Sequence, residues 1–293
     1  MPMNIHRFGL FVTFLFTAAA CNNLNTIDFT ANDNAAIQNE SNVDAQAQEA
    51  DDLATVTVSS DAATLNGRAE TGSRVITTSD TRLKCAVITL EPSSDNTLLK
   101  PHGIITVDFG NGCAGPAGKV RSGKIVLEYI GRRFLPGSKI IITFLQYVVN
   151  GKMLEGTRTL TNTSSSETAA IAFTILEDGM KITYPDGTTA TRTSTFIRTW
   201  NRTANSIDDS FSVSGSAVGI TRKGKEYTMS IKSPLVYKRT CSINNNVFLP
   251  VSGTKELVTD NRRMVVNFGD GNCDDIIELT INGKTKTIDI SAD

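Results

Sequence analysis

The chain has 293 residues and a net charge of −1, so it can form one large or two small domains with a hydrophobic core. The near-balanced charge and the lack of a basic helix or an aromatic-basic patch argue against a nucleic-acid-binding protein, and no nucleic-acid partner is expected. The charge is unevenly spread, however. Residues 22–53 hold seven acidic and no basic residues, whereas residues 54–293 carry 28 basic and 23 acidic residues.

Residues 1–20 have the pattern of a secretory signal peptide. His6 and Arg7 precede an apolar run over 8–16, which is shorter than the ~20 residues that a transmembrane helix needs. Two cleavage sites then compete. The small residues 18–20 fit an ordinary site, and Cys21 directly after them fits a bacterial lipobox. Ala18 departs from the lipobox, which usually has a larger aliphatic residue at that position.

The number of cysteines favours lipidation of Cys21. The chain has five cysteines, and an odd number in an exported protein leaves one unpaired. If Cys21 carries lipid, the other four can form two disulfides. Several acyl chains anchor a protein stably to a membrane. We therefore expect a lipid-anchored protein of the bacterial cell envelope, at the outer membrane; the alternative is a soluble exported protein with a spare thiol.

Residues 21–54 are rich in Asn, Ala, Gln and Asp and contain few bulky apolar residues. Such a segment buries too little apolar surface to offset the entropy lost on ordering. We expect a lipidated, flexible, disordered acidic tether here, in which residues 44–54 could form a short helix.

Residues 55–293 are expected to form an all-β body. Short runs rich in Val, Ile and Thr are separated by turn dipeptides such as Asn150-Gly151 and Asn282-Gly283. Many runs alternate, so that Tyr227, Met229 and Ile231 share one face of a strand. The pattern predicts an antiparallel meander of roughly twelve to fifteen strands, arranged as a sandwich, an open barrel or a long curled sheet.

Two similar stretches indicate an internal twofold repeat. "VDFGNGC" over 107–113 resembles "VNFGDGNC" over 266–273, and the repeat halves lie near 84–131 and 240–290. Each half begins with a further cysteine, and its Gly-rich turn, at Gly110 or Gly269, is followed by the second cysteine and another hydrophobic strand. The register favours one disulfide within each half, although four cysteines allow three pairings. The favoured pairs are Cys85–Cys113 and Cys241–Cys273.

These motifs carry a resemblance. The Cys-terminated leader, the acidic Asn-rich segment, the two "[VI]xFG[ND]G…C" copies, "EGTRTLTN" over 155–162 and "DDSFSVSGSAVGITRKGKEY" over 208–227 resemble a family of uncharacterised lipoproteins of the Bacteroidota. The resemblance covers nearly the whole chain and implies an envelope location and β structure. It implies no activity, substrate or catalytic residue. The first copy lacks the acidic residues that follow the cysteine in the second, Asp274 and Asp275.

No catalytic residues are predicted. His102 is the one histidine beyond the signal peptide, and it stands in a turn without a Ser nucleophile motif. Asp108 and the doublets Asp208-Asp209 and Asp274-Asp275 are the remaining candidates for acid–base chemistry. Adjacent residues of a strand point to opposite faces, so neither doublet is a ready-made catalytic pair. We expect no enzyme activity and no cofactor.

Two stretches are weak candidates for a binding site. Asp270, Asn272 and Asp274 alternate as in the start of a calcium loop, but a bidentate Glu is missing at position twelve, so only a weak calcium site is conceivable. Over 193–202, aromatic and Arg side chains alternate along one strand face. They predict one of two arrangements. The side chains form a ligand-binding surface, or the aromatic residues cover the edge of the core while the Arg side chains extend along it to place their charges in solvent. These residues are Phe196, Arg198, Trp200 and Arg202.

The sequence therefore predicts a cell-envelope lipoprotein with a non-catalytic β scaffold that binds a partner or is structural at the membrane surface. The expected contacts are the membrane, through lipid on Cys21, and a polysaccharide or another envelope protein. Two alternatives stay open: a carrier of an apolar ligand, and a carboxylate-dependent hydrolase of extracellular glycans.

Overall fold

The computed structural model describes residues 29–59, 72–260 and 262–290. Within these ranges lie one long helix and fifteen strands, all in one sheet, with four short helical turns between them. The elements in chain order are α1 (Ala31–Ser59), β1 (Arg74–Ile76), η1 (Thr81–Leu83), β2 (Val87–Pro92), β3 (His102–Asp108), β4 (Cys113–Ala114), η2 (Pro116–Gly118), β5 (Val120–Ile130), β6 (Lys139–Val149), β7 (Lys152–Asn162), β8 (Ile171–Thr183), β9 (Thr189–Asn201), η3 (Ser206–Asp208), β10 (Ser210–Ile220), β11 (Glu226–Lys238), η4 (Cys241–Asn245), β12 (Ser252–Thr259), β13 (Arg262–Asp270), β14 (Ile276–Ile281) and β15 (Lys284–Asp289).

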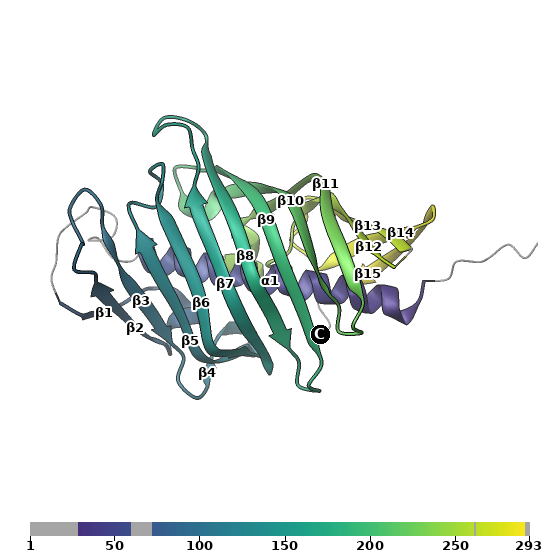
Figure 1. Cartoon of the computed structure of the whole chain (residues 1–293), viewed down its shortest axis with the longest axis horizontal. Helices are drawn as coiled ribbons and strands as arrows, with labels where there is room; N and C mark the ends of the chain where they lie inside the picture. Colours follow the sequence, from purple (N-terminus) through teal and green to yellow (C-terminus); the bar gives the residue numbers. More distant parts are fainter. Residues whose placement is uncertain (1–28, 60–71, 261, 291–293) are drawn as a thin grey trace, which may run out of the picture.

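The sheet is a continuous antiparallel meander. Each strand pairs with the next in the chain, except that the short β4 pairs only with β5 and leaves β3 paired with β5. In the described part of the chain the first and last strands, β1 and β15, do not pair with each other, and the sheet curls round α1 (Figure 1). The expected antiparallel meander is confirmed, and of the three expected arrangements the structure has the long curled sheet.

The helix α1 corrects the sequence-based interpretation of the N-terminal segment. The expected all-β body is mostly β, and the predicted flexible tether is wrong for residues 31–54, which belong to the 29-residue helix. Between residues 31 and 58 only Ala31 and Asn32 are exposed. The proposed short helix at 44–54 is thus part of a longer one. The signal peptide, Cys21 and residues 22–28 lie outside the described residues.

The helix begins at a capping box. The backbone N–H of Thr30 donates to Oδ2 of Asp33 at 2.7 Å, and the N–H of Asp33 donates back to the Thr30 hydroxyl at 3.2 Å. Two of the unpaired N–H groups at the helix start are thereby satisfied. In the last turns, the hydroxyls of Thr55 and Thr57 donate to carbonyls four residues earlier. No helix among the described residues is long and apolar enough to span a membrane.

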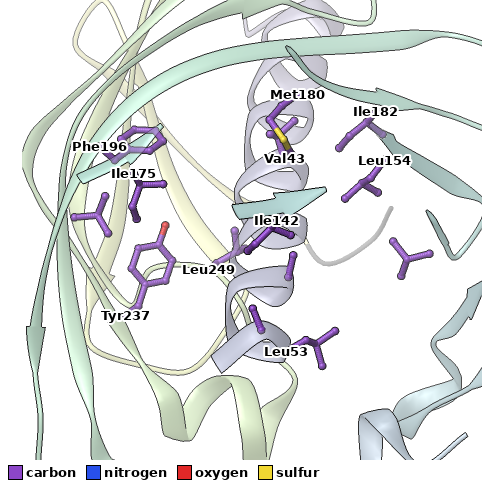
Figure 2. Packing of buried hydrophobic residues seen from close by; sticks show 14 of the residues in the cluster. Val43, Leu53, Ile142, Leu154, Ile175, Met180, Ile182, Phe196, Tyr237 and Leu249 are labelled. Carbon is purple, nitrogen blue, oxygen red and sulfur yellow. The ribbon is translucent and has the colours of Figure 1, made fainter. Parts of the chain in front are cut away.

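The core lies between α1 and the inner face of the sheet (Figure 2). Ile37, Val43 and Leu53 of the helix are buried among inward side chains that recur at every second strand position. Ile142 of β6 and Leu154 of β7 are fully buried examples. A curled sheet of this length encloses a space that its own side chains do not fill, and α1 occupies it.

Glycines at bulges bend the strands round the helix. The pairing register shifts at Gly123, Gly156, Gly215 and Gly253, and all four have positive φ. A bulge adds one residue to one strand and increases its local twist, and glycine accepts the required backbone conformation. At Gly215 a side chain has no room, since an ideal Cβ would lie 2.3 Å from the carbonyl oxygen of Thr195.

The predicted disulfides are confirmed. Cys85 is bonded to Cys113 and Cys241 to Cys273, with Cα–Cα distances of 5.6 and 5.2 Å. Both Gly-rich turns follow a buried Phe, and both first glycines have positive φ, at 59° for Gly110 and 82° for Gly269. The side chains of Asp108 and Asn267 accept from the N–H groups of these glycines. The predicted reversal of the chain at these two glycines was wrong, because β3 and β4, on either side of Gly110, both pair antiparallel with β5, and Gly269 lies within β13.

The two kinds of glycine should respond differently to substitution. Gly269→Ala meets no atom within 4 Å and carries only the strain of a left-handed backbone, about 1–2 kcal/mol. Gly215→Ala, at a φ of 132°, adds a collision with backbone that β9 pairing holds in place, so its loss of unfolding free energy should be clearly larger. Denaturant unfolding of both variants measures this. Equal losses would contradict the role given to the bulge.

Candidate functional site

The inner face of the sheet carries a row of buried basic side chains, here called the inner basic row. None of its members is more than 4% exposed, and each stands at an inward position among apolar neighbours. Such residues are almost never buried without a partner of opposite charge. The row consists of Arg121 of β5, Arg158 of β7, Arg192 and Arg198 of β9, and Lys255 of β12.

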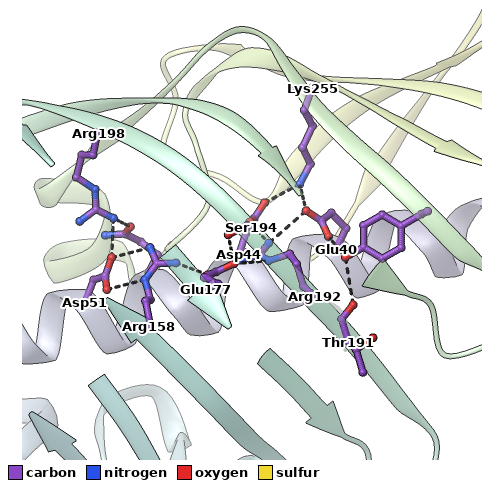
Figure 3. Close-up of polar contacts among 12 residues, drawn as sticks. Glu40, Asp44, Asp51, Arg158, Glu177, Thr191, Arg192, Ser194, Arg198 and Lys255 are labelled. Carbon is purple, nitrogen blue, oxygen red and sulfur yellow. Dashed lines mark hydrogen bonds and ion pairs between the residues drawn. The ribbon is translucent and has the colours of Figure 1, made fainter. Parts of the chain in front are cut away.

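Two carboxylates of α1 bind Arg192 and Lys255 of this row (Figure 3). Asp44 accepts from Nη1 of Arg192 at 2.5 Å and from Nζ of Lys255 at 2.6 Å. One turn earlier, Glu40 accepts from Arg192 at 3.2 Å and from the hydroxyl of Tyr227 at 2.7 Å. Strands β9, β11 and β12 therefore all attach to one stretch of the helix.

A second group forms round Asp51. Arg158 donates two hydrogen bonds of 2.8 Å to its two oxygens, and Arg198 adds a third of 2.6 Å. Glu177 of β8 joins the two groups, since it accepts from Arg158 and, at 2.7 and 2.8 Å, from Arg192 (Figure 3). Bidentate guanidinium–carboxylate pairs are the strong form of this interaction. The network is continuous across β7, β8 and β9.

The remaining carboxylates of α1 are also paired with the sheet or its loops. The six acidic residues of the helix thus all have basic partners, which lie between residues 82 and 262 of the chain. Asp33 binds Arg262 through two hydrogen bonds of 2.6 Å; Glu49 binds Lys119 at 3.0 Å and also Arg121; and Asp52 binds Arg82 at 2.6 Å and Arg239 at 3.3 Å.

Burial and the neighbouring positive charges shift the pKa values of these acids in opposite directions. Burial alone would raise the pKa of Asp44, Glu49, Asp51 and Glu177, but the adjacent Lys and Arg charges outweigh it and hold each pKa below its usual value. The carboxylates are therefore ionised at neutral pH. The site is an ionic contact between two parts of the fold, and it leaves no free general acid or base within it.

One buried guanidinium departs from this pattern. Arg133, in the turn between β5 and β6, is 6% exposed, and none of its three guanidinium nitrogens has a hydrogen-bond partner. Burial lowers the pKa of Arg133 to about 10, and the nearby charge of Arg198 adds to this effect. Its guanidinium carbon lies 5.3 Å from the centroid of the Trp200 ring. Cation–π contacts with aromatic rings stabilise a guanidinium by up to about 2 kcal/mol, whereas removing its charge from water costs several kcal/mol.

The structure places the predicted ligand surface inside the fold. Phe196, Arg198 and Trp200 do share one strand face, but that face is buried against α1, and Arg198 is held by Asp51. Trp200 donates from Nε1 to Asp209 at 3.0 Å. Arg202 alone is exposed, and it lies 4.3 Å from the centroid of the Phe134 ring. Of the two predicted arrangements, the structure has the aromatic residues in the core, because the curl turns this face inward, although Arg198 is itself buried and does not extend to solvent.

The other candidate residues have local structural contacts. In the weak calcium candidate, Asn272 donates to Asp270 at 3.3 Å and the N–H of Ile276 donates to Asp274 at 3.1 Å. The ranges that the structure describes contain no group of three or more His, Cys, Asp or Glu arranged to hold a metal. A calcium site therefore stays an untested prediction.

His102 bridges two carboxylates. Its ring nitrogens lie 2.6 Å from Asp95 and 3.0 Å from Glu128. Partial burial alone would lower the pKa of His102, but these two contacts outweigh it and raise the pKa. Asp108 pairs with Lys124 at 2.9 Å, and Asp209 is buried under Trp200. The structure does not bring Asp108 and Asp209 together as a pair with each other.

A search of protein-family models, of curated proteins and of solved structures finds no match to this chain.

Sequence reasoning missed the ionic contact, although its signals were present. Asp33, Glu40, Asp44 and Asp51 recur at intervals of seven, four and seven residues, which is the spacing of one helix face. The pattern Thr30-x-x-Asp33 is a capping box. Arg198 stands between two aromatic residues on an apolar strand face, a position that a charge takes only when it has a buried partner.

The ionic contact predicts a large effect of neutralising one helix acid. Asp51→Asn keeps the shape but leaves Arg158 and Arg198 buried without their shared charge, so the free energy of unfolding should fall by about 3–5 kcal/mol. The matched control is Asp260→Asn, which breaks an exposed pair with Lys225 of 3.3 Å and should cost less than about 1 kcal/mol. Denaturant unfolding compares them, and similar losses would contradict the ionic role of Asp51.

The lowered pKa values also predict an acid transition. Stabilisation by Asp44, Glu49, Asp51 and Glu177 is fully present above their unfolded pKa of about 4 and is lost as the pH falls through the lower folded values. Hydrogen exchange of α1 and thermal melts should change little between pH 7 and about 5 and fall steeply below about 4. A melting temperature that stays constant down to the lowest pH would refute this coupling.

Proposed function

We propose that this protein is a non-catalytic, lipid-anchored scaffold of the bacterial cell envelope. Lipid on Cys21 attaches it to the outer membrane, and its β body binds a polysaccharide or another envelope protein at the membrane surface. The observation that supports this best is that the interior of the sheet is filled by the protein's own helix through paired charges. A filled interior suits a scaffold.

The helix also bears on how the body is held at the membrane. Ala31, where α1 begins, lies ten positions after Cys21, and a fully extended chain of that length spans at most about 36 Å. The anchored end of the chain thus leads into the core instead of into a long tether. We propose that the body lies close to the membrane and cannot move far from it.

The two alternative functions have weaker support. A carrier would hold its apolar ligand inside the curl, but removing α1 would leave the inner basic row without its counter-charges, and an apolar ligand supplies none. A hydrolase needs carboxylates that can exchange protons. The buried acids here are held by guanidinium and ammonium groups, which keep them ionised.

We also propose that the two disulfide-bonded regions arose by internal duplication. The two regions share a second feature besides their Gly-rich turns, which is an Arg shortly before the first cysteine. Arg82 lies three residues before Cys85, and Arg239 lies two before Cys241. Both guanidiniums bind the same acid, Asp52. An Arg close before the first cysteine of each half would thus hold the same end of the helix.

Lipidation of Cys21 can be tested by fractionating cells that express the full chain. The Cys21→Ser variant should leave the membrane fraction, because it lacks the acyl chains that anchor the wild type. A Cys85→Ser, Cys113→Ser double variant is the control, since it changes cysteines without touching the anchor, and should stay with the membrane. If Cys21→Ser stays membrane-bound like the wild type, the anchor proposal fails.

A further inference from the structure

A solvent-open cavity lies beside the C-terminal part of α1. It has a volume of about 820 Å³, within the range of sites for small ligands. Helix residues Thr55 and Val56 form part of its wall, and Trp200, Arg202 and Arg239 line it from the sheet and its loops. Much of the remaining wall is polar and comes from Ser, Thr and Asn side chains. It does not overlap the centre of the ionic contact at Asp44.

Arg133 lies behind the aromatic wall of this cavity. Its guanidinium carbon is 5.3 Å from the centroid of Trp200 and 5.6 Å from that of Phe134, the two rings that line the cavity. Arg202 approaches the same Phe134 ring at 4.3 Å. Phe134 lies in the turn between β5 and β6 and is only partly buried, and contact between a ligand in the cavity and Arg133 requires its ring to rotate aside.

The positive charge at this place is not matched by the described residues. Arg82 pairs with Asp80, which also lines the cavity, and shares Asp52 with Arg239, while Asp209 is engaged by the N–H groups of Trp200 and Thr203. In the described ranges, neither Arg202, which lines the cavity, nor Arg133, which lies behind its aromatic wall, forms an ion pair with a carboxylate. The C-terminal end of a helix favours a nearby cation. This attraction stabilises the Arg133 charge only weakly, since no nitrogen of its guanidinium donates a hydrogen bond to a helix carbonyl.

We propose that this cavity binds an acidic saccharide, with the carboxylate of a uronate sugar held between Arg133 and Arg202. A carboxylate is the planar anion that a guanidinium binds best. The hydroxyl-bonding side chains of the wall, Ser206, Ser242 and Asn244 among them, suit a sugar ring better than an apolar ligand. The proposal deepens the proposed function, because it names the ligand class of a scaffold that binds without converting. It does not depend on the lipid at Cys21.

The proposal makes an unusual prediction about stability. A charge kept buried for a ligand destabilises the protein alone, so Arg133→Met, which preserves the side-chain length and its contacts with the rings, should melt at a higher temperature than the wild type. Arg158→Met is the matched control at a buried Arg that has carboxylate partners, and it should melt lower. If Arg133→Met also melts lower than the wild type, Arg133 has a structural role and the proposal is overturned.

Binding is tested with the detergent-solubilised full chain and digalacturonic acid, by calorimetry and thermal melts. The neutral disaccharide of the same linkage is the control ligand. The wild type should bind the acidic disaccharide alone and be stabilised by it. Arg133→Met and Arg202→Met should each weaken binding about tenfold or more, as expected for a charge-assisted hydrogen bond. Equal binding of the two sugars, or none of the acidic one, overturns the proposal.

Two further outcomes separate this site from the proposed function. If Arg133→Met does not fold, the exposed Arg202→Met decides the matter, and unchanged affinity in that variant refutes the site. The disaccharide should be recovered intact after long incubation with the protein. If the protein cleaves the disaccharide and the Arg133→Met and Arg202→Met variants do not, the proposed non-catalytic function is refuted. The binding site itself is then supported.

Discussion

The fold depends on the pairing of the α1 carboxylates with the inner basic row of the sheet. Neither partner is suited to exist alone. A helix with six acids among 29 residues, and with Asn and Gln between them, buries little apolar surface of its own. A curled sheet with Arg121, Arg192 and Lys255 on its inner face would have these charges either in water or unpaired. Joined, each supplies the counter-charges of the other.

The same helix explains how an open sheet becomes a closed body. The strands β1 and β15 do not pair in the described part of the chain, yet the regions next to the two disulfides meet. Arg82, before the first disulfide, and Arg239, before the second, share Asp52. Lys119 and Arg82 also lie over the ring of Phe248, in the loop that follows η4. The curl is therefore closed by side chains at the end of α1 and not by backbone pairing.

Local chemistry made most of the sheet predictable from the sequence. Asn150-Gly151 and Asn282-Gly283 have positive φ at both residues, as hairpin turns of this type require. The alternation in β9 identified one face correctly, and the spacing of the Gly-rich turns gave the right cysteine pairs. These features depend on neighbours in the chain or on periods of two residues, and both are visible in a single sequence.

The helix and the ionic contact were not predicted, because their energy comes from residues far apart in the chain. Composition alone treats Glu40 and Asp44 as solvated charges, and under that assumption the segment does not order. The uneven charge, acidic before residue 54 and basic after it, already indicated that the two parts attract. It did not reveal that the attraction occurs inside the sheet, since no local pattern shows which face of a long sheet is enclosed.

This arrangement also constrains the order of folding. Asp44 pairs with Lys255 across 211 residues and Asp33 with Arg262 across 229, so α1 cannot dock fully until β12 and β13 have formed. Contacts of such separation form slowly. The acidic composition that makes α1 a poor helix in isolation is useful during this interval, because a charged segment does not aggregate while its partners are incomplete. Docking of the helix neutralises the charges of the inner face and thereby holds the curl of the sheet.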